Sequence, residues 1–195
     1  MYRPQKKTKQ VVPGQVRVIG GEWRGRKLPV PNAEGLRPTP DRIRETLFNW
    51  LQFSIAGKTC LDAFTGSGAL AVEALSRGAA QVTAIERDIK VAKQLSELLL
   101  PLAGERLTLV NADALHWLKE QSAQAFDVVF LDPPFGQSLL EPACQLLEEK
   151  GWLAEDALIY VEQAKHPAGL ITLPAHWVLH KDKQIGDVHF SLYTR

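Results

Sequence analysis

From residue 58 onward, short apolar stretches alternate with segments of helical periodicity, and this alternation restricts the fold more than any other feature. The expected strands lie within residues 58–64, 80–88, 106–113, 126–135 and 157–163. Strands that alternate with helices form right-handed βαβ units, which give a parallel sheet covered on both faces. Residues 176–194 predict two strands joined by a turn at Gly186, so the last strand runs against the others. The sequence therefore predicts an α/β fold.

A basic segment precedes this pattern. Residues 1–44 carry eleven Lys and Arg against three Asp and Glu, whereas residues 45–195 carry twelve against nineteen. A basic arm on an acidic body predicts contact with a polyanion, although a solvated tail is an equal alternative for residues 1–10. We expect a flexible tail over residues 1–14, a β-hairpin extension over 15–40 and the main domain over 41–195, with Asp41 as the N-cap of its first helix.

The hairpin prediction depends on alternating apolar and polar residues around Gly20–Gly21. Its exposed side is expected to combine cations with an aromatic ring, a composition that suits phosphate contacts and base stacking. The residues are Arg17, Trp23, Arg24, Arg26 and Lys27, and Arg37 and Arg42 lie in the segment that follows. For each arginine the alternative is a solvated surface residue.

A glycine-rich turn, "LDAFTGSGAL", follows the first strand of the alternation and opens a helix. Gly66 and Gly68 allow a close backbone approach to a ligand. Ala71 completes G-x-G-x-x-A, so the spacing alone leaves a nicotinamide enzyme open. The turn predicts a nucleotide-like ligand at the carboxyl edge of the sheet.

Three acids at strand ends favour one kind of ligand. Asp62, Glu86 and Asp113 follow three successive strands, and ligands of open α/β sheets bind beyond those carboxyl ends. A ribose, an adenine amino group and a cationic amino-acid portion suit these carboxylates, whereas a pyrophosphate does not. The set predicts S-adenosylmethionine as cofactor. The alternatives are a helix N-cap for Asp113 and pairing of Glu86 with a neighbouring cation.

The sequence "DPPF" follows the strand at 126–131 and places an acid, two prolines and an aromatic ring in one loop. Asp132 and the carbonyl of Pro133 can accept hydrogen bonds from an aromatic amine, and Phe135 can stack on its ring. The prolines stiffen the loop and aim these acceptors. The alternative is a structural turn that ends the strand.

Cysteine spacing and hydropathy indicate where the protein works and which cofactors it lacks. Cys60 and Cys144 are far apart, and Cys60 lies in an apolar run, so we expect no disulfide. No Cys or His spacing indicates a metal, no apolar run could span a bilayer, and the basic N-terminus lacks a signal-peptide core. We expect a cytoplasmic protein without metal or membrane contact, and a monomer by default.

Taken in order, "DAFTGSG", "ER", "NAD" and "DPPF" resemble the class I S-adenosylmethionine-dependent methyltransferases that act on exocyclic amines. Together with "VRVIGGEWRGRKLPV" and "LRPTPDRIRETLFNWL", the chain is similar over residues 15–193 to the bacterial RsmD-type methyltransferases, which modify guanine N2 in small-subunit (16S) ribosomal RNA. The resemblance implies a Rossmann-like, seven-stranded, mostly parallel sheet with a reversed last strand, and a substrate that is an assembled or partly assembled 30S subunit. It adds Phe64 to the cofactor site.

Two other functions stay open from the residues alone. An adenine-N6 methyltransferase, acting on RNA or DNA, would use the same loop, because adenine, like guanine, presents an amine on a flat ring. A non-catalytic RNA-binding factor for ribosome assembly could have kept the fold. The sequence does not predict which guanine is modified.

Overall fold

The computed structural model describes residues 14–31, 33, 38–165 and 171–195. The predictions for the tail residues 1–13 and for Arg37 lie outside this part of the chain.

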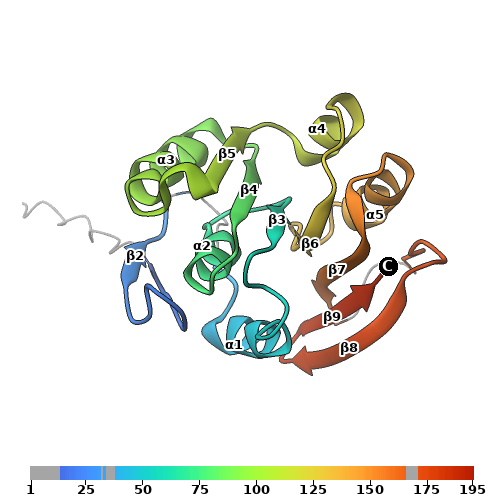
Figure 1. Cartoon of the computed structure of the whole chain (residues 1–195), viewed down its shortest axis with the longest axis horizontal. Helices are drawn as coiled ribbons and strands as arrows, with labels where there is room; N and C mark the ends of the chain where they lie inside the picture. Colours follow the sequence, from blue (N-terminus) through green and yellow to red (C-terminus); the bar gives the residue numbers. More distant parts are fainter. Residues whose placement is uncertain (1–13, 32, 34–37, 166–170) are drawn as a thin grey trace, which may run out of the picture.

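The centre of the protein is a seven-stranded sheet in the order β5-β4-β3-β6-β7-β9-β8 (Figure 1). Its strands are β3 (Thr59–Asp62), β4 (Gln81–Glu86), β5 (Leu107–Asn111), β6 (Phe126–Leu131), β7 (Leu153–Ala164), β8 (Val178–Ile185) and β9 (Val188–Thr194). The strands from β3 to β7 pair in parallel, and β9 is antiparallel to both neighbours. The predicted α/β fold with a reversed last strand is confirmed.

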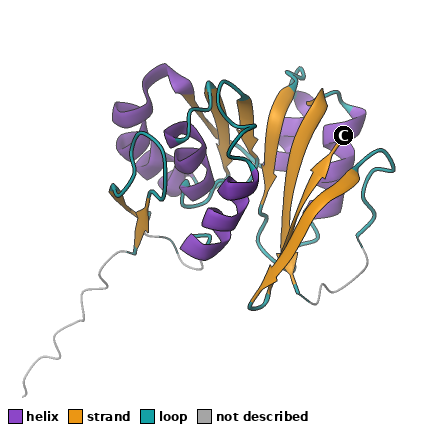
Figure 2. Cartoon of the chain, turned by 60° about the horizontal axis from the view of Figure 1, so that its bottom comes forward, coloured by secondary structure: helices purple, strands orange, loops and turns teal. Residues whose placement is uncertain are grey.

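Helices cover both faces of this sheet (Figure 2). They are α1 (Asp41–Trp50), α2 (Ala69–Ser76), α3 (Ile89–Ala103), α4 (Ala114–Glu120) and α5 (Leu140–Glu149), with a short 3-10 turn at Gly104–Arg106. Buried residues of α1, α2 and α3 form one core with the sheet, and those of α4 and α5 form the other. In the described residues, no helix is both long enough and apolar enough to cross a bilayer.

The N-terminal hairpin pairs β1 (Gln15–Arg17) with β2 (Lys27–Pro29) in antiparallel register, as predicted. Its strands are shorter than the sequence pattern suggested, because the segment between β1 and β2 forms hydrogen bonds with α2 and does not extend the strand pairing. The N–H of Glu22 donates to the Ser76 carbonyl at 2.7 Å, and the N–H of Trp23 donates to Ser76 Oγ at 2.9 Å. The hairpin is therefore fixed to the end of α2.

The expectation that Trp23 lies on the exposed side of the hairpin is wrong. Its side chain is only 8% exposed and belongs to the core formed by α1, α2 and α3. The Arg106 guanidinium lies 5.0 Å from its ring centroid. Burial of the large apolar indole outweighs the polar pattern of its neighbours, so Trp23 fastens the hairpin to the core.

The start of α1 also differs from the prediction. Pro40, not Asp41, is the N-cap residue, and no side chain among the described residues caps this helix end. Asp41 is the first helical residue, and its Oδ1 accepts a hydrogen bond from Arg44 Nη2 at 2.6 Å. The carboxylate is held by a guanidinium one turn along the helix, so it does not turn back onto the backbone.

Candidate active site

The carboxyl ends of four adjacent strands, β4, β3, β6 and β7, meet at one edge of the sheet. The order of the strands reverses between β3 and β6, and such switch points are where open α/β sheets bind ligands. The acids near this edge are Glu86 and Asp62, the last residues of β4 and β3, Asp132, which directly follows β6, and Glu162, two residues before the end of β7. The edge therefore collects most of the residues that the sequence singled out.

The glycine-rich turn joins β3 to α2. Gly66 and Gly68 both have positive φ, of 51° and 75°, and Gly68 is the N-cap of α2. A Cβ on Gly68 would meet the side chains of Leu95 and Leu99 at 3.0 Å, so this glycine is also required for packing against α3. The predicted turn is present, and Gly68 has a structural reason of its own.

Asp62 is buried at the base of this turn. Its Oδ2 accepts hydrogen bonds from Thr65 Oγ1 at 2.8 Å and from the N–H of Ala71 at 3.2 Å. Its Oδ1 is buried and has no hydrogen-bond partner in the described part of the chain. Burial raises the pKa of Asp62 to about 7. The carboxyl orders the turn and keeps one acceptor atom unsatisfied.

Glu86 links the glycine turn to the loop after β4. Its Oε2 accepts from the N–H of Gly66 at 3.0 Å and its Oε1 from the N–H of Asp88 at 2.7 Å. Burial raises its pKa. Each oxygen has a second lone pair, so the half-buried carboxylate can still accept hydrogen bonds from a ligand.

Asp113 caps a helix, which was the alternative reading of this residue. Its Oδ1 accepts from the N–H of His116 at 3.0 Å, at the start of α4. The side chain is exposed at the end of β5. Nearby, the Asn111 amide donates to the carbonyls of Glu86 and Arg87 at 2.8 and 3.1 Å and fixes the loop after β4. Sequence reasoning missed this role of Asn111.

The loop after β6 carries Asp132, Pro133 and Phe135. Asp132 is half-buried, and its Oδ2 accepts from Thr39 Oγ1 at 3.0 Å, which leaves Oδ1 for another donor. Burial raises the pKa of Asp132 to about 6, against the lowering effect of the Thr39 hydroxyl. Pro133 is buried and Phe135 is 49% exposed. An acid and an accessible ring thus lie in one loop.

Glu162 is a site residue that sequence reasoning missed. It is 4% exposed, and its Oε2 accepts from the Tyr160 hydroxyl at 2.6 Å. Leu131 of β6 pairs with Val161 of β7, so the next residues along, Asp132 and Glu162, lie side by side. Burial, and then the charge of Asp132, raise the pKa of Glu162 to about 8. An acid directly after the apolar run "ALIYV" was the available signal.

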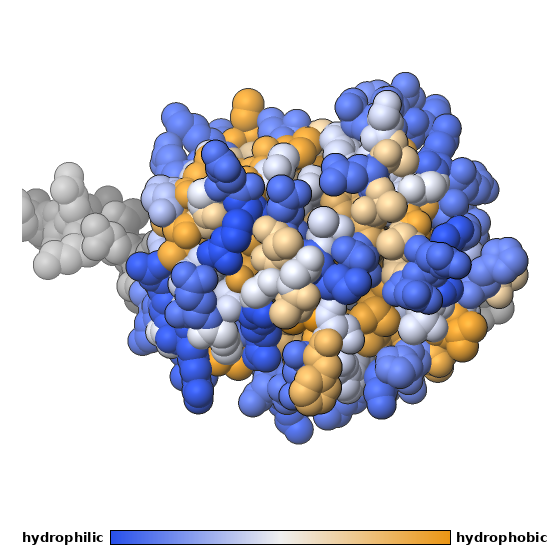
Figure 3. All heavy atoms as spheres, viewed as in Figure 1, coloured by the Kyte–Doolittle hydropathy of each residue, from blue (hydrophilic) through white to orange (hydrophobic). Residues whose placement is uncertain are grey.

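The basic residues of the hairpin are on the surface. Arg17, Arg24, Arg26 and Lys27 are exposed, as is Arg42 on α1. Arg17 lies 3.8 Å from Asp41, whereas none of the described acids forms an ion pair with Arg24, Arg26 or Lys27. Hydrophilic side chains gather over the hairpin at the left of the space-filling view (Figure 3).

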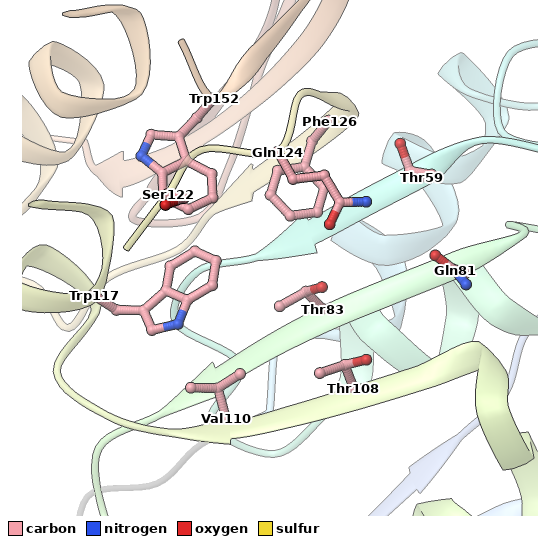
Figure 4. Close-up of a pocket in the computed structure, with 10 residues that line it drawn as sticks. All are labelled: Thr59, Gln81, Thr83, Thr108, Val110, Trp117, Ser122, Gln124, Phe126 and Trp152. Carbon is pink, nitrogen blue, oxygen red and sulfur yellow. The ribbon is translucent and has the colours of Figure 1, made fainter. Parts of the chain in front are cut away.

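A separate pocket lies at the other edge of the sheet, where β3, β4 and β6 begin (Figure 4). Trp117 and Trp152 stack in it with ring centroids 4.6 Å apart, and Thr59 and Gln81 line it from the strand starts. None of the described acids at the carboxyl edge lines this pocket. Across the described ranges, no three His, Cys, Asp or Glu residues are grouped to hold a metal ion.

The chain matches known proteins along almost its whole length. The family model described as conserved hypothetical protein 95 matches residues 16–194. Ribosomal RNA small subunit methyltransferase D of Escherichia coli strain K12 is 53% identical over 182 residues, which cover 93% of this chain and 91% of the relative. The Haemophilus influenzae protein of that name is also 53% identical, over 92% of this chain and 94% of its own length.

A solved structure agrees with these sequence matches. The solved structure of the Escherichia coli protein yhhF has a TM-score of 0.86 at 51% identity, and the match covers 93% of this chain and 98% of that one. Fold and sequence thus agree, and the chain belongs to the conserved hypothetical protein 95 family, the family of the RsmD methyltransferases.

Proposed function

We propose that this protein transfers a methyl group from S-adenosylmethionine to the exocyclic N2 amine of a guanine in 16S ribosomal RNA. It acts in the cytoplasm as a monomer, on an assembled or partly assembled 30S subunit. The observation that carries the proposal is Asp132, whose Oδ1 is left for a donor beside the glycine-rich turn. The relatives at 53% identity are named ribosomal RNA small subunit methyltransferases.

The residues around the glycine turn fit the cofactor. The orphaned Oδ1 of Asp62 is an acceptor that an ammonium group, or a water bound to it, would satisfy. Glu86 has lone pairs for ribose hydroxyls, and Asp113 keeps its Oδ2 for an adenine amine. Phe64, half-buried next to the turn, and Gly66 complete the site. When bound, S-adenosylmethionine would supply an electrophilic methyl group on its sulfonium sulfur and would leave as S-adenosylhomocysteine, a neutral thioether, when the carbon–sulfur bond breaks.

Asp132 and its loop hold the nucleophile. An exocyclic amine is a weak nucleophile because its lone pair is delocalised into the ring. Asp132 Oδ1 and the Pro133 carbonyl accept hydrogen bonds from the two N–H groups of the amine, and this orients the lone pair and stabilises charge that develops on nitrogen. Phe135 stacks on the base, which has to be unpaired or flipped out. After transfer, Asp132 takes up the proton that the nitrogen loses.

The hairpin supplies the RNA contact in this proposal. Arg24, Arg26 and Lys27 are exposed cations with no ion-pair partner among the described acids, so they are available for phosphates. Arg17 and Arg42 extend the basic surface toward α1. Trp23 is buried, so its indole does not stack on RNA.

Identification of the methylated nucleoside tests the function. Small subunits that lack the modification are incubated with protein and labelled S-adenosylmethionine, and the RNA is digested to nucleosides. Label in N2-methylguanosine is the expected result. Label only in N6-methyladenosine would reject the guanine target. Cofactor binding without any transfer would point to a non-catalytic assembly factor.

A further inference from the structure

Arg44 of α1 is a fully buried cation, with 0% of its side chain exposed. Its Nε donates to the Thr39 carbonyl at 3.2 Å, and its Nη1 donates to Glu73 at 3.3 Å. Its Nη2 donates to the Arg17 carbonyl at 2.9 Å and to Asp41 at 2.6 Å. One guanidinium therefore joins the hairpin, the segment before α1 and α2.

Glu73 of α2 is the buried counter-ion and completes the same junction. Besides Arg44, its carboxylate accepts the N–H groups of Ile19 at 2.8 Å and Gly20 at 2.9 Å. Arg77 Nε donates to its Oε1 at 2.8 Å. Because desolvation offsets most of the attraction within a buried ion pair, the pair adds little to stability. Its hydrogen bonds instead fix the positions of the segments that meet at this junction.

Thr39 connects this junction to the candidate active site. Its carbonyl is held by Arg44, and its hydroxyl donates to Asp132 Oδ2 at 3.0 Å. The side chain is buried. A continuous path of hydrogen bonds thus leads from the Arg17 backbone in β1, through Arg44 and Thr39, to the acid after β6.

We propose that Thr39 and Arg44 are positioning residues for methyl transfer, which make the N-terminal hairpin part of the catalytic unit. The inference rests on the proposed role of Asp132. The Thr39 hydroxyl occupies Oδ2, turns Oδ1 toward the amine and favours the ionised carboxylate. Arg44 sets where the Thr39 segment lies relative to the hairpin, so contact of the hairpin with RNA and the position of Asp132 are coupled.

The test compares Thr39→Val with Thr39→Ser and Arg44→Lys. Single-turnover methylation of small subunits is measured against pH at saturating S-adenosylmethionine, with cofactor affinity by calorimetry and folding by circular dichroism. Loss of one hydrogen bond to a charged group predicts a rate lower by about tenfold or more in Thr39→Val. Its acid limb moves to higher pH, because ionised Asp132 loses a donor. Thr39→Ser keeps the wild-type rate and the wild-type acid limb. Arg44→Lys changes the rate and the acid limb in the same direction as Thr39→Val.

The matched control is Thr46→Val, the same change on α1, where the hydroxyl donates to the Arg42 carbonyl at 3.0 Å and to no other group of the described residues. It keeps the wild-type rate and pH profile. A folded, cofactor-binding Thr39→Val with wild-type rate and profile would overturn the inference. If Arg44→Lys does not fold, Thr39→Val decides alone. An active Asp132→Asn would instead overturn the proposed function, so the two failures are distinguishable.

Discussion

Gly21 is the position where one added carbon should cost most in the hairpin. Its φ is +77°, and a Cβ there would lie 1.8 Å from the Ser76 carbonyl oxygen. The backbone of α2 cannot yield as a side chain does, so Gly21→Ala has to lift the connection away from α2. Gly25 is a matched control, because its φ is +81° and a Cβ there would meet no atom of the described residues within 4 Å.

The difference between the two variants follows from the contacts at Gly21. Alanine at a left-handed position costs roughly 1–2 kcal/mol, and this cost is common to both variants. Lifting the connection also breaks the bonds of Glu22 and Trp23 to Ser76, each worth about 1 kcal/mol. Partial exposure of Trp23 adds to this loss. Gly21→Ala should therefore be less stable than Gly25→Ala by about 2–4 kcal/mol.

Urea unfolding and thermal melting of both variants measure this difference. For a chain of this length each kcal/mol lowers Tm by roughly 2–4 °C, so Gly21→Ala should melt roughly 4–16 °C below Gly25→Ala. Tryptophan fluorescence should show that Trp23 becomes more exposed in Gly21→Ala alone. Equal stability of the two variants would refute the docking of the hairpin on α2.

Three further predictions concern pH and salt. Because the pKa of Asp62 rises from 3.8 to about 7 on folding, the contribution of this carboxyl to the free energy of unfolding is present below about pH 4. It is lost as the pH rises to about 7. Urea unfolding should show that Asp62→Asn flattens this decline; an equal decline in wild type and variant would contradict it. The methylation rate should rise through about pH 6 as Asp132 ionises, and a pH-independent rate between 5 and 8 would remove its role as acceptor. Replacing Arg24, Arg26 and Lys27 by alanine should weaken RNA binding and make the plot of log affinity against log salt less steep, because up to about three phosphate contacts are lost. An unchanged slope in a salt titration would place the RNA elsewhere.

The alternation of strands and helices was sufficient to predict the sheet, because each apolar stretch and each amphipathic segment allows few arrangements. The acids at the strand ends could be predicted for the same reason. Parallel strands bring their carboxyl ends to one edge, so Asp62, Glu86 and Asp132 had to lie close together.

Contacts between distant segments could not be predicted in this way. Trp23 stands among cations in the sequence, and only the tertiary contact with Arg106 and α2 shows that it is buried. Arg44 has the sequence context of an exposed helical residue, and its partners come from three segments. Glu162 could not be assigned to the site from the sequence, because only the register of β6 and β7 places it beside Asp132.

The most direct test of the account compares wild type with Asp132→Asn for cofactor affinity and for methyl transfer. Asparagine keeps the shape of the side chain and removes the charge that the amine requires. We expect calorimetry to give nearly the same affinity for S-adenosylmethionine, while the single-turnover rate on small subunits falls by at least about 100-fold. A variant that transfers methyl at the wild-type rate, or that loses the cofactor to the same extent as the rate, would contradict the assignment of Asp132 to the target amine.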